Sequence, residues 1–229
     1  MSGMLCLTFD DLFVENWCAA RSILDDFDAH VTFCISHLHT ASSSQIDGLH
    51  LLQEDGHEIA FHTRTHARLG PYLDRYGLAH WLDHEVDPGI AEHRDLGFPA
   101  RTFACPFHAS TPETRKALGT RFNVVRTDGP RSLDPENPKS RIYQSIPNDK
   151  CLANLGFADV QHKAFPGWKR QLQLLNLIAE TGGRAMFTGH DIRGKKSGKG
   201  FYSTRKQLRR LLEAATSKGL RLTTASTNI

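Results

Sequence analysis

The sequence has no long apolar run and no recognisable export signal. No stretch of its 229 residues approaches the run of about 20 apolar residues that a membrane-spanning helix needs, so we expect no membrane partner. The N-terminal stretch MSGMLCLTFDD lacks the basic region, apolar core and cleavage site of a secretory signal. These two absences predict a cytoplasmic protein.

Cysteine is scarce and shows no pairing pattern. The five cysteines are odd in number and none falls in a CxxC spacing, which argues against a disulfide framework and against a cysteine-rich zinc site. A reducing compartment fits this usage. The five are Cys6, Cys18, Cys34, Cys105 and Cys151.

Neither sign of charge dominates the sequence. The formal net charge is +3, from 28 Lys and Arg against 25 Asp and Glu, and no basic stretch is interleaved with aromatic residues. We therefore expect no nucleic-acid partner. With 39% hydrophobic and 23% charged residues, the composition is that of a globular protein.

What the sequence does have is a regular alternation of short apolar runs with helix-like segments. This alternation predicts an α/β fold with a mostly parallel sheet, which can close into a barrel. No repeat or linker divides the chain, so we predict one domain over residues 1–229. Strands are predicted at 5–9, 31–35, 58–61, 102–107, 122–126, 184–188 and 220–224. Helices are predicted at 15–27, 44–55, 72–96 (one or two, broken near Pro88-Gly89), 111–118, 169–180 and 204–218, with a turn-rich stretch at 128–141.

Two adjacent acids, Asp10 and Asp11, end the first predicted strand in the stretch TFDD. Like charges side by side repel, and a strand end tolerates the pair easily only in water or beside a cation. One interpretation is a solvated turn in which an aspartate caps the next helix. The other is a site that holds a cation.

Histidine is abundant, with thirteen residues, and two of them follow a predicted strand in the stretch HTRTH. His62 and His66 are four residues apart, a spacing that in a helical turn places both imidazoles on one face, where they can share a metal ion. A second pair with this spacing, His80 and His84, lies inside a helix-like segment and is expected to be part of a polar helix face.

A further histidine, His190, ends another predicted strand in the stretch MFTGHDI. In parallel α/β folds the C-terminal strand ends face one another across the active site. Two imidazoles and one carboxylate at such an edge form a catalytic type of zinc site with a position left for water. We therefore expect a divalent metal ion as cofactor, Zn²⁺ by preference.

These motifs resemble those of the NodB-type polysaccharide deacetylases, carbohydrate esterase family four. TFDD at 8–11, HTRTH at 62–66 and His190 in TGHD match the order and spacing of that family's first, second and last motifs. The resemblance implies a distorted, incomplete (β/α) barrel. It also implies a metal-dependent hydrolase that removes an N-acetyl group from an amino sugar, either a small molecule or an oligosaccharide.

The resemblance further implies a role for each residue of these motifs. Asp11 would bind the metal with His62 and His66. Asp10 would be the general base that takes a proton from the activated water, and His190 would be the general acid that protonates the leaving amine.

The family's third motif, Arg-x-Pro-aromatic-Gly, is only partly present in the stretch ACPFH at 104–108. Pro106 and Phe107 match, and a backbone N–H near Phe107 would help to stabilise the oxyanion. Ala104 replaces the arginine that pairs with the catalytic base in the family. Another cation, such as Arg64 or Arg126, could take its place.

Three further positions depart from the family pattern. His108 replaces the glycine of the third motif and could be a metal ligand, a substrate contact or a solvated loop residue. Asp128 is the nearest match to the aspartate of the fourth motif, and could orient His190 or simply occupy a turn. Thr188 replaces a leucine that helps to shape the acetyl pocket, which leaves the accepted acyl group open.

The basic segment RGKKSGKG after His190 is expected to be a mobile, solvated loop. A sharper interpretation makes it a clamp for an anionic substrate such as a phosphorylated or nucleotide-linked sugar. Two other functions remain open: a C–N hydrolase of the same fold acting on a ureide or cyclic amide, and a metal-retaining sugar-binding protein without catalysis. No oligomeric state is predicted.

Overall fold

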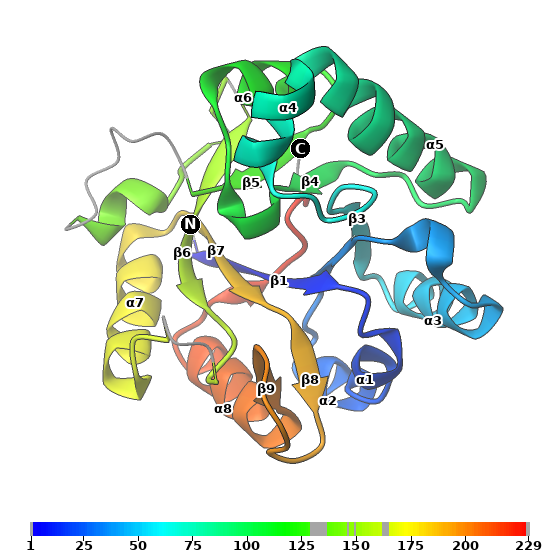
Figure 1. The fold of residues 1–229 in the computed structure, drawn as a ribbon. Coiled ribbons are helices and arrows are strands. Elements are labelled where there is room, and N and C mark those ends of the chain that lie inside the picture. Colours follow the sequence, from blue (N-terminus) through cyan, green and yellow to red (C-terminus); the bar gives the residue numbers. More distant parts are fainter. Residues whose placement is uncertain (1, 129–136, 146, 149, 162–164, 228–229) are drawn as a thin grey trace.

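The centre of the molecule is a parallel β-barrel (Figure 1), seen in a computed structural model that describes residues 2–128, 137–145, 147–148, 150–161 and 165–227. Strands β1 to β7 lie side by side in chain order, and β7 also pairs with β1, so the sheet closes on itself. This confirms the predicted α/β class and the (β/α) barrel. The barrel strands are β1 (Met4–Asp11), β2 (Thr32–Ile35), β3 (Glu58–Phe61), β4 (Thr102–Ala104), β5 (Val124–Thr127), β6 (Cys151–Phe157) and β7 (Arg184–Gly189).

The barrel is distorted at two places. Strands β3 and β4 share a single register pair, Phe61 with Phe103, and the pairing of β6 with β7 is interrupted between Asn154 and Gly156. At Gly156 a Cβ atom would lie 2.8 Å from the ring of Phe187, so only glycine fits there without movement of the ring.

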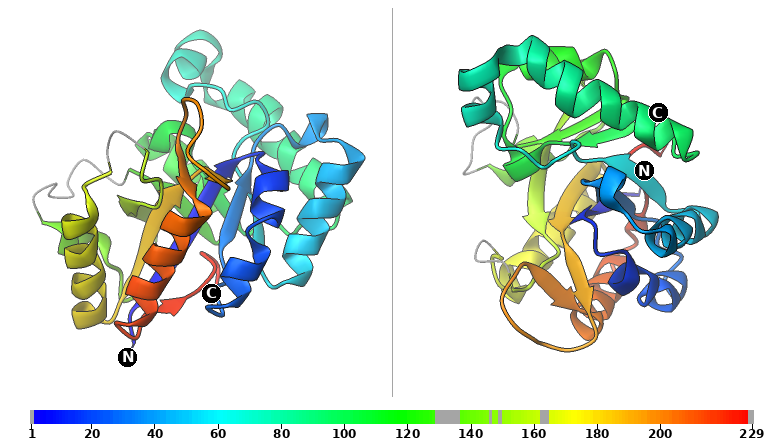
Figure 2. Two further views of the ribbon diagram at one scale, coloured as in Figure 1. Left: turned by 90° about the horizontal axis from the view of Figure 1, so that it is seen from below. Right: turned by 45° about the vertical axis from the view of Figure 1, so that its right-hand side comes forward.

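Helices cover the outside of the barrel (Figures 1 and 2), which leaves the strands buried on both faces and explains their nearly continuous apolar runs. None of the helices in the described ranges has the length and hydropathy needed to cross a membrane. The α-helices are α1 (Val14–Cys18), α2 (Arg21–Asp25), α3 (Ser43–Glu54), α4 (Leu69–Trp81), α5 (Asp87–Asp95), α6 (Pro112–Gly119), α7 (Trp168–Thr181) and α8 (Arg205–Thr216); η1 (Leu38–Thr40), η2 (Leu82–Val86), η3 (Pro106–His108) and η4 (Pro138–Arg141) are shorter or non-α turns.

Two of the predicted helices differ from those in the structure. The helix expected at 15–27 is broken into α1 and α2, and the break accompanies a hydrogen bond from Trp17 Nε1 to the His190 carbonyl oxygen at 2.8 Å. In the segment at 72–96, η2 ends at Val86 and α5 begins at Asp87, close to the predicted break at Pro88-Gly89, and the proline lies in the first turn of α5, where its missing N–H costs nothing. A second break, which was not predicted, is at Gly77, whose φ of 81° lies in the left-handed region.

Strand β6 was not predicted, although it is part of the barrel. Its sequence CLANLGF contains Asn and Gly, residues that are depleted in strands, and this hides it from pattern recognition. Of the predicted turn-rich stretch at 128–141, residues 129–136 lie outside the described residues.

The segment 221–226 closes the N-terminal end of the barrel strands. β10 (Arg221–Leu222) pairs with the first residues of β1. Beyond it, the amides of Ala225 and Ser226 donate to Thr32 Oγ1 at 2.8 Å and to Glu58 Oε2 at 3.1 Å. Arg184 at the start of β7 donates to the Ala225 carbonyl oxygen at 2.6 Å.

Candidate active site

The functional side chains predicted at three strand ends meet in one cavity. Asp10 and Asp11 end β1, His62 follows β3, and His190 follows β7, all at the C-terminal edge of the barrel. The cavity has a volume of about 480 Å³. It is lined by Asp10, Asp11, His62, His66, Arg68, Phe107, His108, Phe157, His190 and Phe201.

Asp11, His62 and His66 form a cluster whose ligand atoms all lie within 4.8 Å of one another. His62 Nδ1 is 2.7 Å from the Ala104 carbonyl oxygen, so Nδ1 carries the proton and Nε2 is left as a ligand atom. Burial lowers the pKa of His62 to about 3, which keeps the ring in the neutral form that a metal requires. One carboxylate and two neutral imidazoles fit a divalent cation such as zinc.

The charges around Asp11 also fit a cation. Burial and the neighbouring Asp10 carboxylate raise the pKa of Asp11, so the ionised form is disfavoured by its surroundings. The His66 Nε2 atom lies 3.6 Å from Asp11 Oδ1. A cation between these groups would relieve the repulsion between the two acids.

The spacing of His62 and His66 suggested a helical turn, but the two histidines do not lie on one. Residues 62–68 form a loop in which Thr63 and His66 have φ values of 60° and 54°. These left-handed residues turn the chain so that the two imidazole rings face each other with centroids 4.8 Å apart. Left-handed non-glycine residues are uncommon and are characteristic of functional sites.

Backbone strain is concentrated around this cavity. In the described ranges, eight non-glycine residues have positive φ values, and five of them belong to the site motifs. His108 is one of the five, at 57°, which explains why the family pattern has glycine at this position. The five are Asp11, Thr63, His66, Phe107 and His108.

Asp10 is held by a buried arginine from β5. Arg126 donates from Nη1 to Asp10 Oδ1 at 2.9 Å and from Nη2 to Oδ2 at 2.6 Å. Arg126 therefore makes the contact with Asp10 that the family pattern assigns to the arginine replaced here by Ala104. The other candidate, Arg64, is paired with Glu92 at 2.7 Å instead.

Arg126 is completely buried and is part of a larger polar network. Its Nη1 atom also donates to Thr8 Oγ1 at 2.5 Å and to Thr188 Oγ1 at 3.1 Å. The Thr188 hydroxyl in turn donates to Asn154 Oδ1 at 3.0 Å. Burial opposes the ionisation of Asp10, but the attraction of Arg126 outweighs it and holds the pKa of Asp10 below its ordinary value.

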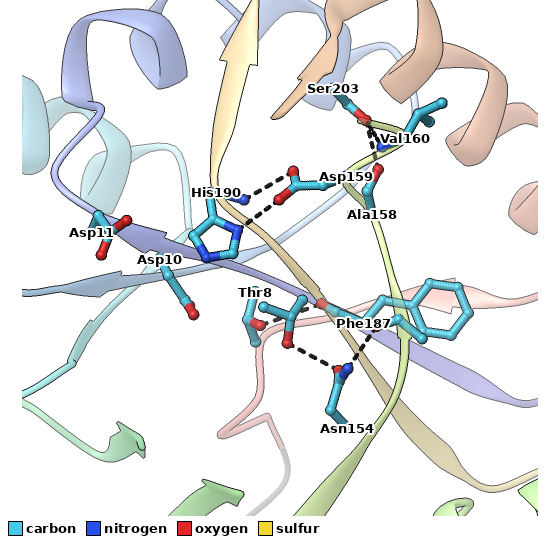
Figure 3. Close-up of polar contacts among 12 residues, drawn as sticks. Thr8, Asp10, Asp11, Asn154, Ala158, Asp159, Val160, Phe187, His190 and Ser203 are labelled. Carbon is cyan, nitrogen blue, oxygen red and sulfur yellow. Dashed lines mark hydrogen bonds and ion pairs between the residues drawn. The ribbon is translucent and has the colours of Figure 1, made fainter. Parts of the chain in front are cut away.

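The ring of His190 is held by Asp159, and not by Asp128 as the sequence had suggested. His190 Nδ1 is 2.6 Å from Asp159 Oδ2, and the His190 amide donates to Asp159 Oδ1 at 3.0 Å. Figure 3 shows the ring between this carboxylate and the Asp10–Asp11 end of β1. Asp128 is exposed, and its amide donates to the His108 carbonyl oxygen at 3.0 Å. Asp159 was missed because it follows the unpredicted strand β6.

The pKa of His190 is raised above its ordinary value. Burial of the ring opposes protonation, but the hydrogen bond to Asp159 and the charge of Asp10 outweigh it. The surroundings thus favour the ionised carboxylate of Asp10 and the protonated ring of His190.

The turn Pro106–His108 forms one wall of the cavity. The Phe107 side chain is 50% exposed, and its ring centroid lies 4.8 Å from that of His66. His108 is not a solvated loop residue, since burial lowers its pKa to about 3 and its ring packs edge-on to Phe157. His108 does not belong to the Asp11–His62–His66 cluster.

The basic segment after His190 is framed by two short strands, β8 (Asp191–Arg193) and β9 (Tyr202–Thr204). Arg193 is bound to Asp191 at 2.6 Å and to the carbonyl oxygens of residues 197 and 199. The lysines of this segment are exposed and do not line the described cavity, whereas Phe201 does.

Comparison with known proteins agrees with these motifs. The sequence model described as polysaccharide deacetylase matches residues 2–120. No curated protein matches the sequence.

Solved structures share the fold at low sequence identity. The catalytic domain of a peptidoglycan N-acetylglucosamine deacetylase from Eubacterium rectale has a TM-score of 0.56 and 15% identity, over 99% of this chain and 90% of that one. A family 4 carbohydrate esterase from Streptomyces lividans, solved with acetate, has a TM-score of 0.59 and 14% identity, over 96% of this chain and 91% of that one. A polysaccharide deacetylase from Bacillus cereus has a TM-score of 0.59 and 13% identity, over 98% of this chain and 93% of that one. With the family match over more than half of its length, the chain belongs to the polysaccharide deacetylase family.

Proposed function

We propose that this protein is a metal-dependent hydrolase that removes an N-acetyl group from an amino sugar or a larger carbohydrate. The observation that carries the proposal is the cavity in which Asp10 and His190 lie beside the Asp11–His62–His66 cluster. Membership of the polysaccharide deacetylase family supports it.

Asp11, His62 and His66 would hold the divalent cation. When bound, the cation supplies a Lewis acid that lowers the pKa of a water molecule from 15.7 toward about 7 and stabilises negative charge. The protein keeps both imidazoles neutral, because burial lowers the pKa values of His62 and His66.

Asp10 is the proton acceptor of the proposed reaction. Its pKa is held low by Arg126, so the carboxylate is ionised at neutral pH. The two hydrogen bonds from the guanidinium fix the plane of the carboxylate, which prevents it from turning away from the attacking water. Asp10 takes a proton from that water as the new C–O bond forms.

His190 is the proton donor. Asp159 binds Nδ1, so Nε2 is the ring nitrogen that donates to the nitrogen of the scissile amide. As the C–N bond breaks, the nitrogen receives this proton and leaves as the amine, and acetate is the other product.

The turn at Pro106–His108 can stabilise the oxyanion. In this turn the amides of His108 and Ala109 donate to the carbonyl oxygens of Cys105 and Pro106. Phe107 lines the cavity, and its amide would donate to the acetamido oxygen as that oxygen gains charge.

Acetate release from a panel of N-acetylated sugars tests the proposal. The panel holds free, nucleotide-linked and oligomeric sugars, and metal content is measured on the same sample. The variant Asp10→Asn should lose about 10²- to 10⁴-fold in rate and keep the metal content of the wild type. Asp26→Asn, which changes an exposed aspartate paired with Arg209, is the matched control.

Two outcomes would overturn the proposal. Metal-loaded protein that releases no acetate from any sugar would exclude the deacetylase, and the same sample would next be assayed on ureides and cyclic amides. An Asp10→Asn variant with full activity would exclude Asp10 as the base. Sugar binding without hydrolysis would identify a binding protein.

A further inference from the structure

Arg68 is a cation in the cavity wall that no carboxylate of the described residues neutralises. It precedes α4, two residues after His66, and lines the same cavity as the metal cluster. Its guanidinium lies 4.2 Å from the centroid of the Phe107 ring. Phe107 in turn contacts His66, so one aromatic ring connects the arginine to the metal cluster.

Three arginines that lie near the site motifs are engaged by acids. Arg126 binds Asp10, Arg64 binds Glu92 at 2.7 Å, and Arg193 binds Asp191 at 2.6 Å. The Arg68 side chain makes no hydrogen bond or ion pair within the described residues, and its guanidinium stacks on the ring of Phe107. Stacking positions the planar guanidinium and leaves its N–H donors available.

The carboxylates of the cavity do not offset the charge of Arg68. Asp10 is neutralised by Arg126, and Asp11 belongs to the metal cluster. Arg68 is therefore an exposed positive charge on the cavity wall that no described carboxylate pairs with.

We propose that Arg68 binds an anionic group of the substrate, so that the enzyme acts on an N-acetylated sugar bearing a carboxylate or a phosphate. This inference rests on the proposed deacetylase function and names its substrate class. A guanidinium recognises either anion through paired N–H···O hydrogen bonds, which are stronger than bonds between neutral groups. It also reassigns anion recognition from the lysines of the 193–199 segment, which do not line the described cavity, to the loop that carries His66.

The rest of the cavity complements such a substrate. Phe107 and Phe201 are 50% and 45% exposed, and their rings lie beside His66 and His190 respectively. Aromatic faces of this kind can pack against the apolar face of a sugar ring. The charged group would lie on the Phe107 side, where Arg68 is.

Matched neutral and anionic sugars test the inference. N-acetylglucosamine, its 1-phosphate and 6-phosphate, and N-acetylmuramic acid are compared by kcat/KM for acetate release in the wild type, Arg68→Gln and Arg68→Lys. Affinities for the same sugars are measured by calorimetry in the Asp10→Asn background. Arg64→Gln, which removes an arginine of the same loop that is paired with Glu92, is the control.

We expect the wild type to prefer at least one anionic sugar over N-acetylglucosamine by about tenfold or more, and Arg68→Gln to abolish that preference. Arg68→Lys should retain part of the preference for the anionic sugar, and Arg64→Gln should retain all of it. Added salt should weaken the preference. A carboxylate preference and a phosphate preference are told apart by which sugar is favoured.

Two results would overturn the inference. One is an equal or higher kcat/KM and affinity for the neutral sugar in the wild type, and the other is a preference for anions that Arg68→Gln leaves unchanged. If no sugar releases acetate, the proposed function fails, whereas the calorimetric preference and its loss in Arg68→Gln still decide the role of Arg68.

Discussion

Ala104 and Arg126 are register partners on the adjacent strands β4 and β5. The resemblance to the family places an arginine at position 104, and the arginine that binds Asp10 stands at the paired position one strand further around the barrel. Neighbouring strands are about 4.8 Å apart, a distance that a long arginine side chain can span. Asp10 thus has an arginine partner although the motif has lost its arginine.

This relocation predicts that an arginine at position 104 can substitute for Arg126. Arg126→Ala leaves a buried carboxylate unpaired, which should cost about 3–5 kcal/mol of stability and raise the pKa of Asp10. Its activity should fall by about a hundredfold or more, and the double variant Ala104→Arg/Arg126→Ala should recover at least about tenfold of this loss. Steady-state kinetics and chemical denaturation of both proteins measure these effects. Unimpaired activity of Arg126→Ala would contradict the assignment.

Asp159 predicts a specific change in pH dependence. The hydrogen bond from His190 to Asp159 raises the pKa of His190, so the ring stays protonated to higher pH and the alkaline limb of activity follows that raised pKa. Asp159→Asn removes the charge, lowers the pKa of His190 and should move the alkaline limb to lower pH. The pH profile of kcat/KM measures this shift.

Asp128→Asn is the matched control for Asp159→Asn, because it changes the aspartate that is the nearest match to the family's fourth motif. It should leave the alkaline limb where the wild type has it. A shift in Asp128→Asn without one in Asp159→Asn would reverse the assignment.

Thr188 is predicted to be part of the support of Arg126, which explains why the family leucine is absent here. Its hydroxyl accepts from Arg126 and donates to Asn154, so Thr188→Val leaves buried polar groups with fewer partners. The expected cost is about 1–3 kcal/mol in the free energy of unfolding. Thr188→Leu should cost more, since it also adds volume to a packed interior. Thr120→Val, which removes an exposed hydroxyl, is the control. Urea denaturation measures the free energy of unfolding of each variant.

Metal binding should depend on His66 and not on the other histidine pair with the same spacing. Chelation should abolish activity and lower the melting temperature, because a ligand of the folded state stabilises it by mass action. His66→Ala should reduce metal content, whereas His80→Ala should not, since the His80 and His84 rings are stacked on each other 3.7 Å apart. Equal losses of metal in the two variants would exclude the proposed cluster.

The strand-end residues could be predicted from sequence because the barrel brings every C-terminal strand end to one edge. The alternation of apolar runs and helices was enough to place Asp10, His62 and His190 on that edge. The spacing of the residues could not predict the local backbone conformation, because His62 and His66 meet through a loop with left-handed residues and not along a helix.

The partners of Asp10 and His190 were harder to predict, and for different reasons. Arg126 was one of two candidate cations, and only the pairing of β4 with β5 distinguishes it from Arg64. Asp159 follows β6, whose Asn and Gly residues conceal a strand. Arg68 was missed because an arginine without an acid is recognised only when the positions of all the surrounding carboxylates are known.

The junction of β1 with β7 and β10 has a consequence for how the chain folds. The first residues of β1 acquire their neighbours from residues 184–189 and 221–222, nearly the whole length of the chain away. Contacts of such large sequence separation carry a high loop-closure entropy and slow the folding of a domain. Until residues 221–222 have been synthesised, Met4 and Leu5 of β1 lack the partner that β10 provides on one of their two edges. A nascent chain would therefore expose an unpaired apolar edge late into synthesis, which is the period in which aggregation competes with folding.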